Sequence, residues 1–397
     1  MLSATTTFDR AAKRVWDAVI VGAGPAGAMA AGRLARLGRS VLLVDKSAFP
    51  REKVCGCCIS AAAIQTLKSA GIELPSFPNS SELRGMCLAA EGRTASFSLP
   101  PGVIISRCDF DSHLIRVAIA AGVDFLPRTL ARETLHDADS RSVTLVAGSQ
   151  QFKVRGRVIL VAEGIHGQLL RSDRSLRVRP DARIGVATTL HCASSDYAPN
   201  SVYMACADSG YVGLVRFADG SLHIAAAIDP AVTRRMGVGC AVEAIVCKAG
   251  LPPPDDLKNA AWQGTIPLTR TRGQIASNRL FVLGDATGYV EPFTGEGIAW
   301  SLASGQAVAP LVDAAIRQWS DRFISDWTIL QNRLIRRRQL ICRASARALR
   351  HPRLISWTVR AVRLMPSLAT PFTGMLNFPY LLTQSDGRTP LQPSPIR

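Results

Sequence analysis

The sequence lacks any uninterrupted apolar run long enough to cross a bilayer, and no apolar run precedes Asp17. A membrane-spanning protein is therefore not expected, and no secretory signal is predicted. Histidine is scarce: the six residues are dispersed, none joins cysteine at metal-ligand spacing, and no metal site is expected. The ten cysteines are scattered rather than arranged as a disulfide framework, which predicts reduced thiols and a cytoplasmic protein.

Acidic side chains are missing from one long segment near the C-terminus. Residues 331–363 contain ten arginines, no Asp and no Glu, and apolar residues are interleaved with the arginines. A basic amphipathic helix of this kind can lie on an anionic membrane, so we expect peripheral contact with the inner face of the membrane. An ordinary solvated basic face is the alternative. Nucleic acid is not an expected partner of this chain of net charge +17, because no binding motif accompanies the charge.

The most specific motif lies near the N-terminus. A short apolar strand leads into Gly22, Gly24 and Gly27, an Ala-rich helix follows, and a second apolar strand ends at Asp45. Gly22 allows a tight turn, Gly24 lets a pyrophosphate approach the backbone, and Gly27 lets the helix pack on the strand. Asp45 stands where a carboxylate accepts hydrogen bonds from ribose hydroxyls. The motif predicts a dinucleotide site, to which Pro25, Ala26 and Lys46 also belong.

Three further segments have a pattern that points to the same ligand. An apolar strand ends in Gly284 and Asp285, and a loop with Pro292, Gly295 and Gly297 leads into a helix. The stretch "VILVAEGIHGQLLR" contains Glu163 and Gly164, and "ISRCDF" contains Arg107.

From Trp16 to about Gly305, these segments together resemble the FAD-dependent oxidoreductases with the para-hydroxybenzoate hydroxylase fold. The resemblance implies that Asp285 binds the ribityl chain, that the Pro and Gly residues line the flavin ring, and that Arg107 contacts FAD. An ion pair between Arg107 and a neighbouring acid is the alternative. In that family, the segment that contains Glu163 here usually has an Asp at the position of Glu163 and a Ser at the position of Gly167. NADPH or NADH is the expected electron donor, although these departures weaken the case for direct reduction.

The stretch "FPREKVCGCCIS" follows the second strand. It resembles the cysteine loop of the geranylgeranyl reductase branch, also seen in related flavin monooxygenases, which makes Cys55 a candidate catalytic residue. A redox pair among Cys55, Cys57 and Cys58 is one alternative, and a metal site is a weaker one. The favoured interpretation of Cys57 and Cys58 is packing against flavin or substrate.

Alternating apolar patterns between Arg183 and Ile228 predict antiparallel strands. The resemblance implies that this sheet roofs the substrate over the flavin. The polar candidates on these strands are His191, Tyr203, Tyr211, Arg216 and His223. Tyr211 is the second candidate catalytic residue, because it alone matches the aromatic signature of geranylgeranyl reductases. The Trp-x-Trp-x-Ile-Pro signature of flavin halogenases is absent, which disfavours halogenation.

The expected fold class is α/β: a Rossmann-like FAD-binding domain with an inserted antiparallel-sheet substrate domain and a C-terminal helical tail. The FAD-binding domain comprises residues 1–80, 101–182 and 275–325. Substrate-sheet strands lie in 81–100, the substrate domain is 183–274, and 326–397 is the basic helical region.

The expected function is that of an FAD-dependent monooxygenase that hydroxylates an apolar aromatic or lipid-like substrate through a flavin hydroperoxide. Two alternatives stay open. The first is reduction of alkene bonds in a prenyl lipid, as in geranylgeranyl reductases, and the second is a non-catalytic flavin-binding protein.

Overall fold

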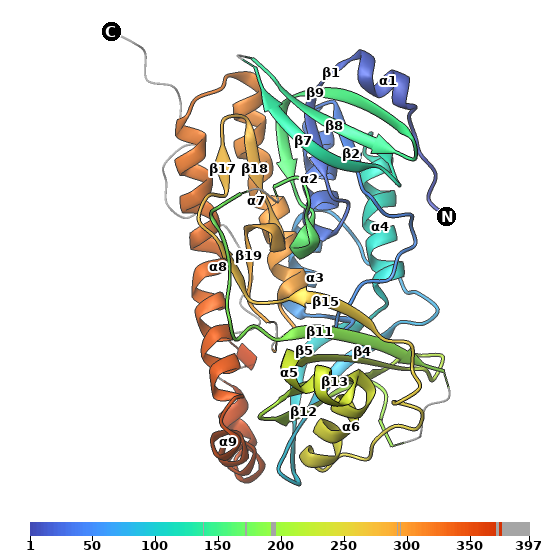
Figure 1. Cartoon of the computed structure of the whole chain (residues 1–397), viewed down its shortest axis with the longest axis vertical. Coiled ribbons are helices and arrows are strands. Elements are labelled where there is room, and N and C mark those ends of the chain that lie inside the picture. The colour runs from blue at the N-terminus through green and yellow to red at the C-terminus, as the bar shows by residue number, and fades with distance from the viewer. Residues whose placement is uncertain are drawn as a thin grey trace.

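The computed structural model of the chain describes residues 1–137, 139–170, 173–191, 196–291, 293, 295–370 and 373–374. Two large sheets occupy opposite ends of the molecule, and two successive helices near the C-terminus run along one side of both (Figure 1). This arrangement confirms the predicted fold class.

The first sheet is built around parallel strands from distant parts of the chain. Its strands, in spatial order, are β17 (Ala276–Ser277), β18 (Leu280–Val282), β9 (Gln150–Val161), β1 (Val15–Val21), β2 (Val41–Val44) and β6 (Asp124–Leu126). The pairs from β18 to β6 are parallel. Two antiparallel strands, β7 (Leu130–His136) and β8 (Arg141–Ala147), extend β9.

Helices α1 (Phe8–Lys13), α2 (Pro25–Arg36), α3 (Ala61–Ser69), α4 (Arg107–Ala120) and α7 (Gly297–Arg317) share one apolar core with this sheet. Local sequence explains where two of them begin. Pro25 occupies the first turn of α2, where its missing N–H costs nothing. Ser106 caps α4, and its hydroxyl accepts a hydrogen bond from the backbone N–H of Asp109 at 3.1 Å.

The second sheet contains the predicted substrate strands. In spatial order they are β15 (Gln263–Pro267), β11 (Ile184–Leu190), β14 (Leu222–Ile228), β13 (Gly210–Arg216), β12 (Ser201–Ala207), β4 (Ser81–Ala90), β5 (Arg93–Ile104) and β3 (Cys58–Ile59). Neighbouring strands are antiparallel except β4 and β12, which come from separate segments of the chain and pair in parallel. The two-residue β3 belongs to the cysteine loop, so that loop joins the two halves of the molecule.

The two faces of the second sheet are covered differently. One face packs against α5 (Pro230–Met236) and α6 (Val238–Ala249). The other face contributes to a second group of buried side chains, here called the apolar cluster, together with residues of α9 (Pro352–Leu364). Members of the apolar cluster include Cys57, Leu83, Met204, Cys206, Tyr211, Phe293, Ile355 and Val359.

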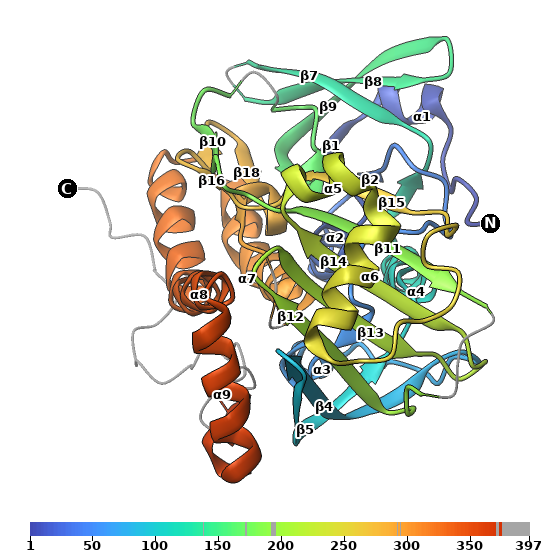
Figure 2. The same cartoon turned by 60° about the horizontal axis from the view of Figure 1, so that its bottom comes forward.

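The predicted basic region forms α8 (Arg322–Ala348), α9 and a short turn at Pro366–Ala369. In a rotated view, α9 turns away from the end of α8 and lies beside β4 and β5 (Figure 2). Across the residues that the structure describes, no helix combines the length and apolar character that crossing a membrane requires. The domain boundaries themselves stay a prediction. A short three-stranded sheet of β10 (Leu176–Val178), β16 (Arg270–Arg272) and β19 (Gly288–Tyr289) lies where the predicted domains meet.

Candidate functional site: a dinucleotide cleft beside an apolar sheet

The loop after β1 has no room for side chains at two of its three motif glycines. Gly22 has a φ of +105°, and a Cβ atom there would lie 2.4 Å from the carbonyl oxygen of Ala162. A Cβ atom on Gly27 would lie 1.8 Å from the carbonyl oxygen of Gly22. The fold itself therefore requires both glycines, whether or not a ligand is bound.

Gly24 is different, because nothing in the protein requires it to be glycine. A Cβ atom there would meet only Nη2 of the Arg51 side chain, at 3.4 Å. Its φ of −74° is open to any residue. The space beside Gly24 lies at the N-terminus of α2, where backbone N–H groups and the helix dipole favour an anionic group such as a pyrophosphate.

Asp45 ends β2 and is almost fully buried. One carboxylate oxygen accepts a hydrogen bond from the backbone N–H of Ala23 at 2.7 Å, and the other accepts one from Ser47 at 2.8 Å. Asp45 thus closes the glycine loop, and Nη1 of Arg51 lies 3.4 Å from both of its carboxylate oxygens. The neighbouring Lys46 donates from Nζ to the carbonyl oxygen of His166, at 3.3 Å. A hydrogen bond from Asp45 to ribose stays a prediction.

A cleft with a cavity volume of about 160 Å³ opens between these segments. The predicted residues on its wall are Gly22, Gly24, Pro25, Ala26, Asp45, Lys46, Glu163, Gly164 and Asp285. Gly27, Arg107 and Gly284 lie behind this wall in the packed structure. The cleft offers backbone N–H donors at the start of α2, the carboxylates of Asp45 and Asp285, and the cations Arg51 and Lys53. These groups fit an elongated dinucleotide with a central pyrophosphate, as FAD has.

Glu163 stabilises the turn after β9. Its Oε2 atom accepts a hydrogen bond from the backbone N–H of Leu169 at 3.0 Å, and burial raises the pKa of the carboxyl. Gly164 has a φ of +67°, and a Cβ atom there would lie 3.3 Å from Nζ of Lys53. Arg171, the last residue of this motif, lies outside the described residues.

The second predicted flavin segment also reaches the cleft. Asp285 is half-buried, desolvation raises the pKa of its carboxyl, and Oγ of Ser301 donates to Oδ1 at 3.3 Å. Gly284 has a φ of +56°, and its backbone N–H donates to Oγ of Ser304. Gly297 begins α7 and Gly295 precedes it with a φ of +71°. Pro292 lies outside the described residues, so its predicted contact with the flavin ring stays untested.

Arg107 forms the ion pair that was the alternative to FAD contact. Its Nε and Nη2 atoms donate to the two carboxylate oxygens of Asp111, at 2.9 and 2.7 Å, and both side chains are buried. The Asp111 carboxylate also lies 3.5 Å from Nη2 of Arg51. Lys53 is half-buried near this pair, and desolvation together with the charge of Arg107 lowers the pKa of the Lys53 ammonium. The pair therefore supports the wall of the cleft, and contact between Arg107 and FAD stays a prediction.

The cysteine loop passes between the cleft and the second sheet. Cys55, Cys57 and Cys58 are free thiols. The carbonyl oxygen of Cys55 lies 2.7 Å from Nε2 of His223 on β14, which ties the loop to the sheet. Burial raises the pKa of the Cys57 thiol to about 12 and raises that of Cys58 as well, so both thiols are protonated at neutral pH. Packing describes Cys57, a member of the apolar cluster, better than redox chemistry does.

Tyr211 lies in the apolar cluster, with its ring edge-on to Phe293 at 5.2 Å between centroids. Its catalytic role, like that of Cys55, stays a prediction.

Sequence reasoning missed two residues next to Tyr211, Arg183 and Glu291. No local motif marks either residue, because only the folded chain brings β11, β13 and the loop after β19 together.

Comparison with known proteins agrees with this geometry. A menaquinone reductase of Mycobacterium tuberculosis is 28% identical over 324 residues, which cover 75% of this chain and 76% of that protein. A digeranylgeranylglycerophospholipid reductase of Methanocaldococcus jannaschii is 24% identical over 342 residues, covering 79% and 81%.

Solved structures share the fold. A geranylgeranyl bacteriochlorophyll reductase-like protein from Thermoplasma acidophilum has a TM-score of 0.74 and 19% identity, over 88% of this chain and 92% of that chain. A triple mutant of a flavin-dependent brominase has a TM-score of 0.76 and 17% identity, over 91% and 94%. The family model described as "FAD binding domain" matches residues 16–218. The chain is therefore an FAD-dependent oxidoreductase and belongs to the FAD-binding-domain family with the para-hydroxybenzoate hydroxylase fold.

Proposed function

We propose that this chain is an FAD-dependent reductase that saturates a carbon–carbon double bond in a lipid with an isoprenoid chain. The observation that carries the proposal is the apolar cluster, which extends from Phe293 in the loop before α7 to Ile355 and Val359 on α9. Apolar side chains such as these suit contact with a long hydrocarbon chain better than contact with a small polar aromatic ring. The names of the curated relatives describe reductases of a prenylated quinone and of a geranylgeranyl lipid, which supports the same substrate class.

In this proposal, the glycine loop, Asp45 and Asp285 hold FAD, which when reduced and bound supplies the two electrons for the reaction. NADPH or NADH is the proposed source of those electrons. The protein's own part is to position the double bond and to exclude water. In this proposal, buried side chains of β12, β13 and β14 position the double bond and exclude water on one side of the substrate. The cysteine loop and the loop after β19 do the same on its other side.

Product analysis separates reduction from the hydroxylation that the sequence favoured. The FAD-loaded protein is incubated with NADPH or NADH and geranylgeraniol, and the product is identified by mass spectrometry. Reduction adds pairs of hydrogen atoms and no oxygen. A product that carries an added oxygen atom contradicts the proposal in favour of hydroxylation, and the absence of any product with either donor supports a non-catalytic flavin protein.

We also propose that α9 docks on an anionic membrane. Its inner face is buried through Ile355, Val359 and Val362, whereas Leu354, Trp357 and Leu364 are 50%, 67% and 72% exposed. Their spacing of three and seven residues forms a second apolar stripe on the outer face. The guanidinium of Arg360 lies 5.8 Å from the Trp357 ring, and no Asp or Glu occurs between Asp326 and Asp386. An apolar stripe with arginines and no acids suits anionic lipid headgroups.

Replacing Trp357 and Leu364 together by serine should weaken binding to phosphatidylglycerol-containing vesicles by about tenfold or more, because two exposed apolar anchors are lost. Co-sedimentation measures the bound fraction. The matched control is Leu135→Ser, which removes an apolar side chain that is 56% exposed on β7. Equal binding of the double variant and the control would rule out α9 as the docking surface.

A further inference from the structure

Three buried polar atoms without a hydrogen-bond partner lie near one another at the edge of the apolar cluster. They are Nη1 of Arg183, Oε2 of Glu291 and the hydroxyl of Tyr211. The three residues are 0%, 3% and 6% exposed. Nη1 of Arg183 lies 3.7 Å from Oε1 of Glu291, and the guanidinium carbon lies 5.8 Å from the centre of the Tyr211 ring. Arg183 directly precedes β11, Glu291 lies in the loop after β19, and Tyr211 is on β13.

Buried polar atoms are almost always hydrogen-bonded in native proteins, because leaving one unpaired costs stability. Three such atoms on adjacent side chains therefore call for a molecule between them. Packing alone does not explain them, since the remaining atoms of Arg183 are satisfied. Its Nε lies 3.3 Å from Oδ1 of Asp229, and its Nη2 donates to the carbonyl oxygen of Asp208 at 3.0 Å.

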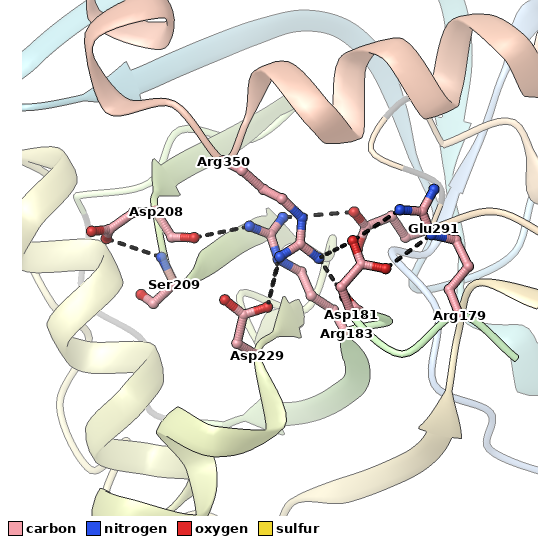
Figure 3. Close-up of polar contacts among 8 residues, drawn as sticks. All are labelled: Arg179, Asp181, Arg183, Asp208, Ser209, Asp229, Glu291 and Arg350. Atoms are coloured by element: carbon pink, nitrogen blue, oxygen red, sulfur yellow. Dashed lines mark hydrogen bonds and ion pairs between the residues drawn. The ribbon is translucent and has the colours of Figure 1, made fainter.

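The charges around these atoms are close to balanced (Figure 3). The guanidinium of Arg350 faces Asp229 at 3.5 Å and Asp181 at 3.9 Å, so two arginines, Arg183 and Arg350, face two aspartates. Arg179 also pairs with Asp181, but from an exposed position. Burial raises the pKa of the Glu291 carboxyl, while the nearby Arg183 and Arg350 act in the opposite direction. The described arginines drawn in Figure 3 all pair with acidic side chains, so a diphosphate would meet no unpaired cation among them.

The N–H of Arg183 and the O–H of Tyr211 are donors, and the Oε2 atom of Glu291 is a third polar atom without a partner. Unpaired polar atoms on adjacent buried side chains suit an oxygen atom that accepts hydrogen bonds from these donors. Tyr211 and Phe293 belong to the apolar cluster, and Glu291 stands two residues after Tyr289 in the segment that leads to α7. A chain lying along the apolar cluster would therefore have its polar end at these donors.

We propose that Arg183, Glu291 and Tyr211 form a binding site for one uncharged oxygen atom of the substrate, a carbonyl or a hydroxyl group. This inference rests on the proposed function and narrows its substrate class. Neutral isoprenoid alcohols and quinones bind there, whereas isoprenoid diphosphates and plain hydrocarbons lack the matching group.

Binding to the oxidised, FAD-loaded protein tests the site without turnover. The change in flavin absorbance is titrated with geranylgeraniol, with the hydrocarbon that lacks its hydroxyl, and with geranylgeranyl diphosphate. We expect the alcohol to bind about tenfold more tightly than the other two, as a site that hydrogen-bonds an oxygen discriminates against a ligand without it. Equal affinity of alcohol and hydrocarbon overturns the proposal and leaves only a bound water at the site.

Two variants assign the preference to these residues. Tyr211→Phe removes only the hydroxyl and should lower the preference for the alcohol severalfold, and Glu291→Leu should lower it further. Tyr203→Phe is the matched control on the same sheet, because its hydroxyl already accepts a hydrogen bond from the backbone N–H of Ala198. An unchanged preference in Tyr211→Phe and Glu291→Leu contradicts the site. If wild-type protein binds the alcohol preferentially but never reduces it, the site stands and the proposed reductase activity fails.

Discussion

Replacing Gly24 by valine should abolish FAD binding while the protein remains folded. A Cβ atom at this position meets no backbone and touches only the flexible end of Arg51, at 3.4 Å. The added side chain instead occupies the space at the N-terminus of α2 where a pyrophosphate approaches the backbone. We expect the dissociation constant for FAD to rise by about 100-fold or more, equivalent to about 2.7 kcal/mol, as measured by flavin fluorescence titration of the apo-protein.

Substitutions at two other glycines serve as controls for this prediction. Gly264→Val, on the exposed strand β15 where a Cβ atom meets nothing within 4 Å, should leave both folding and FAD affinity unchanged. Gly27→Val should fail to fold, because its Cβ atom would lie 1.8 Å from a backbone oxygen. If Gly24→Val binds FAD as tightly as wild type, the cleft beside α2 is not the cofactor site.

Replacing Arg107 by leucine should cost about 3–5 kcal/mol of unfolding free energy, the range for breaking a buried ion pair. Asp111 is 0% exposed and accepts two hydrogen bonds from Arg107. The variant leaves its carboxylate buried with only a distant contact to Arg51, at 3.5 Å. Urea denaturation of the apo-protein measures the loss without any contribution from bound FAD.

The double variant Arg107→Leu with Asp111→Leu removes both charges of the ion pair. It therefore distinguishes the cost of an unpaired buried charge from the cost of the changed side-chain volume. It should be more stable than Arg107→Leu alone, because no unpaired charge remains in the core. Arg317→Leu breaks an i,i+4 pair in which the arginine is 68% exposed, and it should cost less than about 1 kcal/mol. A cost for Arg107→Leu as small as that of Arg317→Leu would show that the Arg107–Asp111 pair does not stabilise the wall of the cleft.

The cofactor lobe could be predicted from the sequence because its signals are local. The spacing of Gly22, Gly24 and Gly27 between two apolar strands fixes a turn and a helix start, and Asp45 follows within the same unit. The second strand–loop–helix segment, around Asp285, repeats this kind of signal. The structure places Asp45 and Asp285 on one cleft, as these local patterns indicated.

The polar site at the substrate end could not be predicted, because its members share no local pattern. Arg183, Glu291 and Arg350 are separated by many residues and meet only when the second sheet, the loop after β19 and the end of α8 pack together. The alternation of side chains between the two faces of β13 places Tyr211 on a buried face of the sheet. This pattern does not show which side chains from other segments face Tyr211. Arg107 is a similar case, since the sequence favoured flavin contact and kept an ion pair with a neighbouring acid as the alternative.

Anaerobic single-turnover kinetics test the central claim most directly. The FAD-loaded protein is reduced chemically and mixed with geranylgeraniol in the absence of oxygen, and the flavin absorbance is followed over time. The proposed reductase predicts that the substrate alone reoxidises the flavin and gains two hydrogen atoms per double bond reduced. If the flavin stays reduced until oxygen enters, and the product then contains an added oxygen atom, the chain is a hydroxylase and the proposed function is wrong.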